Sequence, residues 1–186
     1  MRIVGGKFRG KKILSPLSDN TRPTSDRVRE MIFNVLLHNP AFGPSVLIDK
    51  AVLDVCAGTG ALGLEALSRG AKSATFIEND RTALSILRAN IKDFEASSAC
   101  ILEKDAQHLG KAPSPFDLVF LDPPYGQNLI LPTLIQLSSQ GWLSPEAIVV
   151  IEIGKNEDVP SLPFLSFTTE RTSGITKAVF SKYTQI

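Results

Sequence analysis

Short apolar runs alternate along the chain with segments whose apolar residues follow a helical spacing. Apolar runs that end at glycine, proline or an acid are typical of strands buried in the centre of a sheet. We expect five such strands, at residues 51–56, 73–78, 99–102, 116–121 and 147–153. The helical spacing predicts helices between them, at residues 61–68, 80–91 and 131–139.

Two later segments, 164–170 and 177–183, alternate apolar and polar residues on either side of Ser173 and Gly174. This pattern is typical of an antiparallel hairpin. Strands that alternate with helices usually form a parallel sheet with helices on both faces. The sequence therefore predicts an α/β fold: a doubly wound, mostly parallel, seven-stranded Rossmann-like sheet that ends in an antiparallel hairpin.

The start of the chain has a different pattern. Residues 1–14 are rich in basic residues and glycine and are expected to form a small basic β-hairpin. A helix is expected at residues 25–38, because its apolar residues recur on one stripe: Val28, Met31, Ile32, Val35 and Leu36. We therefore expect an N-terminal extension, residues 1–44, packed on a main domain, residues 45–186.

The composition is that of a globular protein with a full core, with 43% hydrophobic and 21% charged residues among 186. No apolar run approaches the ~20 residues of a membrane span, and the chain opens without the apolar segment of a signal peptide. Cys56 and Cys100 each fall in an expected buried strand, which favours core packing in a reducing cytoplasm. The cysteines and the two histidines, His38 and His108, are scattered, so no metal site is expected.

The net charge is only +1, but the positive residues gather near the start of the chain. Clustered cations on a nearly neutral protein are a candidate surface for binding phosphates, and a solvated basic tail is the alternative. The candidate residues are Arg2, Lys7, Arg9, Lys11, Lys12, Arg22, Arg27 and Arg29. Phe8 lies among them and either stacks on a base or packs under the hairpin.

The fourth expected strand ends in Asp122, Pro123, Pro124 and Tyr125. Open α/β sheets bind ligands at the carboxyl ends of their strands, and two prolines make the backbone there rigid. The Asp122 carboxylate and the Pro123 carbonyl can each accept a hydrogen bond from an exocyclic amino group, while Tyr125 can stack on a base. We therefore expect these four residues to bind and position a nitrogen-bearing ring.

The first expected strand leads into a glycine-rich turn that opens a helix. Gly58, Gly60 and Gly63 match the dinucleotide fingerprint, and Glu78 follows at the end of the next strand. Glycines let backbone N–H groups approach a ligand closely, and an acid at the position of Glu78 can bind both hydroxyls of a ribose. The combination predicts a site for a nucleoside-containing cofactor.

Asp54 and Asp122 decide which cofactor fits best. The negative charge of Asp54, four residues before Gly58, would repel a pyrophosphate but would attract the amino group of S-adenosylmethionine. Asp105, after the third strand, is placed to accept a hydrogen bond from the adenine amino group, and a turn aspartate is the alternative. The predicted cofactor-binding residues are Asp54, Ala57, Gly58, Gly60, Glu78, Asn79, Asp105 and Ala106.

Together these motifs resemble class I S-adenosylmethionine-dependent methyltransferases that modify exocyclic amino groups. Three segments narrow the resemblance to the RsmD family: residues 2–10 (RIVGGKFRG), 22–30 (RPTSDRVRE) and 61–70 (ALGLEALSRG). Members of that family methylate the N2 amine of a guanine in bacterial 16S ribosomal RNA. The resemblance implies that the basic extension binds RNA phosphates and that the substrate is a small ribosomal subunit. A monomeric cytoplasmic enzyme without a metal is expected.

Other readings share parts of this pattern. An N6-adenine methyltransferase would also carry Asp122 to Tyr125, but it usually needs an added target-recognition region. A glutamine-side-chain methyltransferase would more often have Asn in place of Asp122. An NAD-dependent oxidoreductase would use residues 58–63 without needing Asp54. A non-catalytic RNA-binding module would keep the basic extension but would have no use for the cofactor turn.

Overall fold

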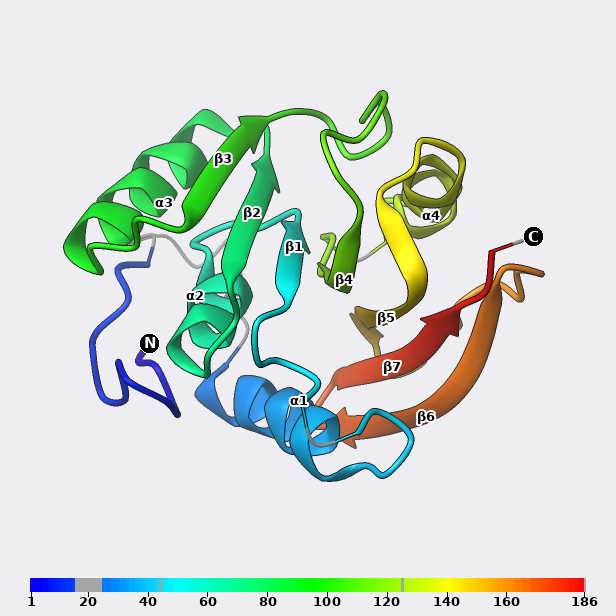
Figure 1. The fold of residues 1–186 in the computed structure, drawn as a ribbon, viewed down its shortest axis with the longest axis horizontal. Helices are drawn as coiled ribbons and strands as arrows, with labels where there is room; N and C mark the ends of the chain where they lie inside the picture. The colour runs from blue at the N-terminus through cyan, green and yellow to red at the C-terminus, as the bar shows by residue number, and fades with distance from the viewer. Residues whose placement is uncertain (16–24, 44, 125, 186) are drawn as a thin grey trace.

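One seven-stranded sheet runs through the molecule, with the strand order β3-β2-β1-β4-β5-β7-β6 (Figure 1). The computed structural model describes residues 1–15, 25–43, 45–124 and 126–185. The strands are β1 (Ala51–Val55), β2 (Ser73–Glu78), β3 (Ala99–Glu103), β4 (Phe116–Leu121), β5 (Leu143–Gly154), β6 (Leu165–Ser173) and β7 (Thr176–Tyr183). The helices are α1 (Asp26–His38), α2 (Ala61–Ser68), α3 (Arg81–Asp93) and α4 (Ile130–Ser139).

The predicted fold class is confirmed. Strands β1 to β5 pair in parallel, while β7 is antiparallel to both β5 and β6. The curved C-terminal hairpin forms one end of the sheet (Figure 1). The main difference in boundaries is β5, which begins at Leu143 instead of residue 147.

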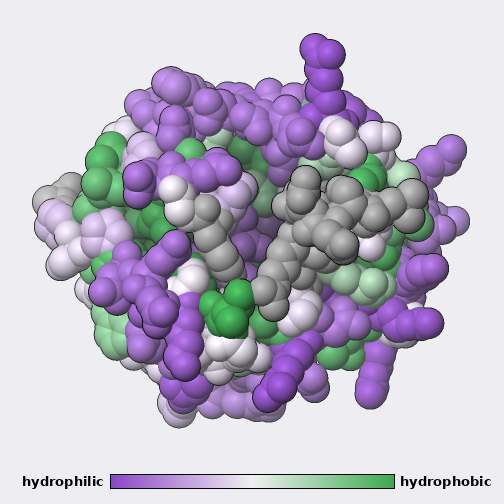
Figure 2. All heavy atoms as spheres, turned by 180° about the vertical axis from the view of Figure 1, so that it is seen from behind, coloured by the Kyte–Doolittle hydropathy of each residue, from purple (hydrophilic) through white to green (hydrophobic). Residues whose placement is uncertain are grey.

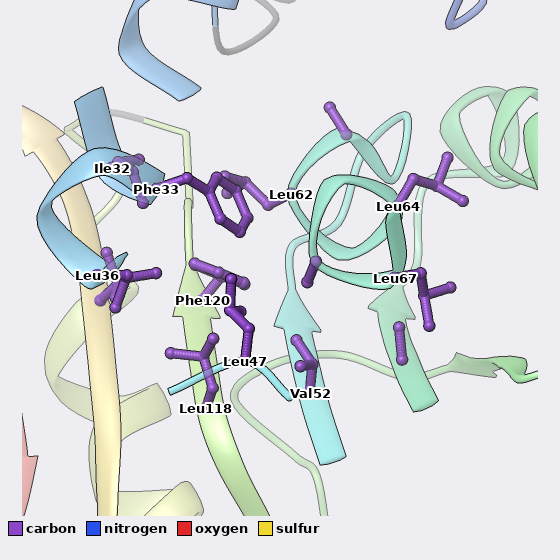
Figure 3. Packing of buried hydrophobic residues seen from close by; sticks show 14 of the residues in the cluster. Ile32, Phe33, Leu36, Leu47, Val52, Leu62, Leu64, Leu67, Leu118 and Phe120 are labelled. Carbon is purple, nitrogen blue, oxygen red and sulfur yellow. The ribbon is translucent and has the colours of Figure 1, made fainter. Parts of the chain in front are cut away.

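Two apolar cores lie on opposite faces of this sheet. Alternate strand residues point to opposite faces, so Val52 and Phe120 pack on one side while Leu53 and Val119 pack on the other. The first face is covered by α1 and α2, and Figure 3 shows Phe33 of α1 pointing toward Leu62 and Phe120. The second face is covered by α4 and by the buried side chain of Trp142.

Helix α1 begins where Ser25 accepts a hydrogen bond from the N–H of Val28 (3.2 Å), which satisfies one of the free donors of the first turn. Val28, Ile32 and Leu36 are buried, as the predicted stripe requires. Arg29 is buried as well, with none of its side chain exposed. The expectation that Arg29 belongs to an exposed phosphate-binding surface is therefore wrong, because this helix packs against the sheet on one side and the N-terminal arm on another.

The N-terminal arm, residues 1–14, doubles back on itself with a single antiparallel bridge between Arg2 and Lys12 instead of regular strands. Its apolar residues Ile3 and Ile13 are almost fully buried and join the core under α1 and α2. Phe8 packs edge-on against Phe94, with 5.3 Å between ring centroids. The arm is therefore part of the folded core, and of the two readings for Phe8, packing is the one seen.

A buried carboxylate holds the arm against α2. Glu65 has no exposed side-chain surface, and its two oxygens accept hydrogen bonds from the N–H groups of Val4 and Gly5, each at 2.8 Å. The same carboxylate pairs with Arg69 (2.7 Å) and with Arg29 (3.5 Å). Glu65 thus pairs with two arginines and satisfies two backbone donors away from water.

Asn90 of α3 makes a second connection. Its side-chain NH₂ donates to the carbonyl of Thr59 in the glycine turn (2.9 Å) and to the carbonyl of Leu14 in the arm (3.1 Å). Its oxygen accepts from the N–H of Leu14 (2.9 Å). One amide therefore links the end of the arm to the glycine turn.

Within residues 1–15, 25–43, 45–124 and 126–185, no helix is both long enough and apolar enough to cross a membrane.

Replacement of Glu65 by Ala should lower the free energy of unfolding by roughly 3–5 kcal/mol, because it removes one of the two carboxylates that pair with the buried Arg29 and leaves the N–H groups of Val4 and Gly5 without their acceptor. Urea unfolding followed by circular dichroism measures this change. Glu103 is the matched control, since it forms an exposed ion pair with Arg88, and Glu103→Ala should cost less than about 1 kcal/mol. Equal losses for the two variants would contradict the role given to Glu65.

Candidate active site

A cavity of about 890 Å³ opens at the carboxyl ends of β1, β2, β4 and β5. The face seen in Figure 2 is mostly hydrophilic and is hollowed near its centre. Most of the residues predicted for the cofactor and the target base line this one cavity. They are Asp54, Ala57, Gly58, Glu78, Asn79, Asp105, Ala106, Asp122, Pro123 and Pro124. Tyr125 lies outside the described residues.

The glycine turn is shaped by two different requirements. Gly58 has a φ of +54°, and a Cβ built on it would meet nothing within 4 Å, so this position leaves the backbone open to a ligand. Gly60 does not line the cavity. A Cβ there would lie 2.5 Å from Leu87 Cδ1, which makes the glycine necessary for packing of the turn on α3.

Asp54 is buried at the end of β1, with 1% of its surface exposed. Its Oδ2 accepts a hydrogen bond from the N–H of Gly63 (2.8 Å), which ties the strand to the start of α2. Burial raises the pKa of Asp54 well above the ordinary aspartate value, and the negative charges of Asp122 and Glu78 raise this pKa further. The three carboxylates are therefore near one another, and a cation entering the cavity would favour ionisation of Asp54.

Glu78 is held by the backbone around it. Its Oε2 accepts from the N–H of Gly58 (2.8 Å), and its Oε1 accepts from the N–H groups of Asn79 and Asp80, both at 2.8 Å. These bonds orient the carboxylate at the wall of the cavity. A carboxylate has about four acceptor positions and three are used here, so Oε2 of Glu78 retains capacity for a ligand hydroxyl.

Asp105 is exposed and is positioned by its own turn. Its Oδ1 accepts from the N–H of Gln107 (2.8 Å), and its Oδ2 lies 3.3 Å from His108 Nδ1. The hydrogen bond from Gln107 lowers the pKa of Asp105, and His108 lowers it further. Asp105 therefore stabilises its own turn and also lines the cavity.

Asp122 follows the last residue of β4 and is half-buried, and its N–H donates to the carbonyl of Val55 (3.3 Å). Pro123 is buried and Pro124 is exposed, and both line the cavity beside Asp122. The rigid pair of prolines thus presents the acid next to the glycine turn, as the sequence predicts.

Several lining residues escaped the sequence analysis: Cys56, Lys104, Glu152 and Thr176. Glu152 had a usable signal, since it is the one charged residue within the apolar run from Ala147 to Ile153. No sequence signal marked Thr176, because it lies at the cavity only as a result of the pairing of β7 with β5.

The expectation for the cysteines is partly wrong. Cys100 is exposed, because β3 is an edge strand of the sheet and one of its faces meets solvent. Cys56 comes just after β1 and lines the cavity. Burial raises the pKa of the Cys56 thiol to about 12, and the charges of Glu78 and Asp122 raise it too. Such a thiol stays protonated and unreactive near neutral pH.

The predicted phosphate-binding residues separate into three groups. Arg2, Lys7, Arg9, Lys12 and Arg27 are exposed. Lys11 is partly exposed and pairs with Asp93 of α3, while its ammonium lies 4.6 Å from the ring centroid of Phe94. Arg29 is buried against Asp26 and Glu65, so it is not available to a phosphate. Arg22 lies outside the described residues.

Among the residues that the structure describes, no group of three or more histidine, cysteine, aspartate or glutamate side chains is arranged to hold a metal ion.

Comparison with known proteins identifies the family of this chain. The family model described as "Conserved hypothetical protein 95" matches residues 1–182. The chain is 40% identical over 164 residues to "Ribosomal RNA small subunit methyltransferase D" of Escherichia coli K12, covering 88% of this chain and 79% of that protein. It is 36% identical over 180 residues to the protein of the same name from Haemophilus influenzae, and the alignment covers 94% of this chain and 90% of that protein.

A solved structure of yhhF from Escherichia coli has the same fold. Its TM-score to this chain is 0.84 at 36% sequence identity, and the alignment covers 100% of this chain and 99% of that one. The match therefore includes the N-terminal arm as well as the sheet. The chain belongs to the RsmD family of methyltransferases.

Proposed function

We propose that this protein transfers a methyl group from S-adenosylmethionine to the N2 amine of a guanine in 16S ribosomal RNA. One observation carries the proposal: Asp54, Glu78 and Asp122, from three neighbouring strands, line one cavity. The printed names of the relatives, which concern small-subunit ribosomal RNA, support the substrate. We further propose that the enzyme works as a monomer in the cytoplasm on a small ribosomal subunit.

The donor set fits S-adenosylmethionine better than a dinucleotide. The cavity presents a buried acid whose ionisation is opposed by its neighbours, which favours a ligand with a positive charge at that point. Asp54 and Gly58 would hold the methionine portion, Glu78 the ribose and Asp105 the adenine, with Ala57, Asn79 and Ala106 completing the walls. When bound, this cofactor supplies an electrophilic methyl group. A pyrophosphate would meet the same acids with an unfavourable charge.

The residues of β4 would act on the base. A guanine must leave its stack to enter a cavity of this kind. Its 2-amino nitrogen is a weak nucleophile because the lone pair is delocalised into the ring. Hydrogen bonds from this amine to the Asp122 carboxylate and the Pro123 carbonyl would orient the lone pair and stabilise the positive charge that develops on nitrogen. Tyr125 is proposed to stack on the base.

The exposed cations would bring the RNA to this cavity. Arg27 lines the cavity at the start of α1. Arg2, Lys7, Arg9 and Lys12 are exposed on the arm, which packs against the C-terminal ends of α2 and α3. Phosphate contacts of this kind position a nucleic acid without reading its sequence. We propose that these five residues and Arg22 bind the RNA backbone.

Replacement of Asp122 by Ala should lower the rate of methyl transfer by roughly 100-fold or more, because the amine loses its main electrostatic partner. The assay uses radiolabelled S-adenosylmethionine and small ribosomal subunits from a strain that lacks the gene, and the methylated nucleotide is then mapped. Asp158→Ala, at an exposed position, is the control. Turnover of the Asp122 variant within threefold of the parent would refute its role, and methylation of anything other than guanine N2 would refute the proposed reaction.

Binding of S-adenosylmethionine should release a proton and weaken as the pH falls below the raised pKa of Asp54. The free protein holds Asp54 protonated in that range, and a cationic amino group favours its ionised form, so affinity and proton release are linked. Isothermal titration in buffers of different ionisation enthalpy, over about pH 5 to 8, measures the released proton. Asp54→Asn should bind roughly 10- to 100-fold more weakly and release none. An identical pH dependence in the two proteins would refute this assignment.

The arm should be tested by removing its charges and keeping its backbone, because Ile3 and Ile13 are part of the core. Changing Lys7, Arg9 and Lys12 together to Gln should weaken binding of 16S RNA and reduce the slope of log affinity against log salt by roughly 2 to 3.

The control for the arm variant changes Lys50, Lys72 and Lys111 to Gln. Lys50 and Lys72 directly precede β1 and β2, and Lys111 lies in the loop before β4, so none of the three belongs to the arm. Filter binding at several salt concentrations gives both slopes. An unchanged slope in the arm variant, with normal folding, would contradict the proposed role of the arm.

A further inference from the structure

Glu152 is a buried acid that the reaction described above does not use. It lies near the end of β5 with only 5% of its surface exposed, inside a run that is otherwise apolar from Ala147 to Ile153. Carboxylates are rarely buried in the centre of a sheet unless they have a partner or a function. Glu152 also lines the 890 Å³ cavity, so this buried acid lies at the wall of the site.

Glu152 and Asp122 occupy neighbouring positions. Strands β4 and β5 are parallel, and their last registered pair is Leu121 with Ile151, so Asp122 and Glu152 follow one step further on adjacent strands. Two residues earlier, Phe120 and Val150 pack together on the α1 and α2 face. Because side chains alternate along a strand, Asp122 and Glu152 point to that same side.

The strand order separates the two ends of the cavity. The residues assigned to the cofactor lie at the ends of β1 and β2 or just after β1, β2 and β3, whereas Glu152 belongs to β5 and Thr176 to β7. Asp122, after β4, lies between these groups. Thr176 is buried, and Ile175 beside it is 54% exposed at the turn of the C-terminal hairpin. On the proposed function, the end of the cavity beyond Asp122 is the one left for the target base.

We propose that Glu152 selects guanine by accepting a hydrogen bond from its N1–H, while Asp122 accepts from the neighbouring N2 amine. This inference rests on the proposed function. Guanine presents these two donors side by side, which two adjacent carboxylates match. Adenine carries an unprotonated N1 next to its amino group, so a carboxylate at that point would meet a second acceptor. Glu152 is thus a specificity-determining residue that leaves the chemistry at N2 to Asp122.

The test replaces the target guanine by 2-aminopurine in ligated 16S RNA assembled into small subunits, once the methylated nucleotide has been mapped. This analogue keeps the 2-amino group but has no hydrogen on N1 and no oxygen on C6. Inosine in place of guanine, which lacks the amine, sets the background. For each base, kcat/KM for methyl transfer is measured with the parent protein and with Glu152→Gln.

The parent should prefer guanine over 2-aminopurine by roughly 100-fold or more, since a site built to bind an N–H rejects an analogue without it. Glu152→Gln should lower kcat/KM on guanine by roughly 10-fold, because a neutral acceptor replaces a charged one. Its amide can donate to the bare N1 of 2-aminopurine, so the preference for guanine should fall by at least about 10-fold. A purely structural role for Glu152 would slow both substrates equally and leave the preference unchanged.

The control variant is Glu146→Gln, an exposed glutamate at the other end of β5, which should keep the preference of the parent. Melting temperature and S-adenosylmethionine affinity report whether Glu152→Gln is folded with an intact cofactor site. Should that variant fail to fold, equal use of guanine and 2-aminopurine by the parent would by itself overturn the inference. An unchanged preference in a folded variant would overturn it as well, while a parent that methylates no guanine would overturn the proposed function instead.

Discussion

Two carboxylates hold the glycine turn in place, and the rest of the site depends on them. Asp54 accepts from the N–H of Gly63 and Glu78 accepts from the N–H of Gly58, so the turn is fixed at both ends by side chains of β1 and β2. Hydrogen bonds to charged acceptors are stronger than those between neutral groups. The same acids that would contact a cofactor therefore also shape the loop that receives it.

This arrangement gathers negative charge in a confined space. The charges of Glu78 and Asp122 both oppose ionisation of Asp54, and both raise the pKa of Cys56. A folded protein tolerates such repulsion at a site where a ligand relieves it. This concentration of negative charge would favour a ligand that carries a positive charge.

The sequence predicted the parts of the structure that depend on local pattern. The strand and helix order, the turn at Gly58 and the acid before two prolines all follow from short-range signals, and each lies where it was expected. What it missed depends on neighbours distant in the chain. Arg29 looked exposed because its partner Glu65 belongs to another helix, and Cys100 looked buried because the sequence does not show that β3 is an edge strand. The contribution of Thr176 to the cavity likewise requires knowledge of the sheet order.

The N-terminal arm is joined to the methyltransferase core by side chains that belong to the core. Glu65, Ser68 and Asn90 receive or donate hydrogen bonds along its backbone from Val4 to Leu14, and Asn90 reaches the glycine turn at the same time. Transplanting the arm onto a related enzyme would therefore require these three recipient residues to be carried with it. A chimera that lacked them would leave buried backbone donors unsatisfied and would loosen the turn at Thr59.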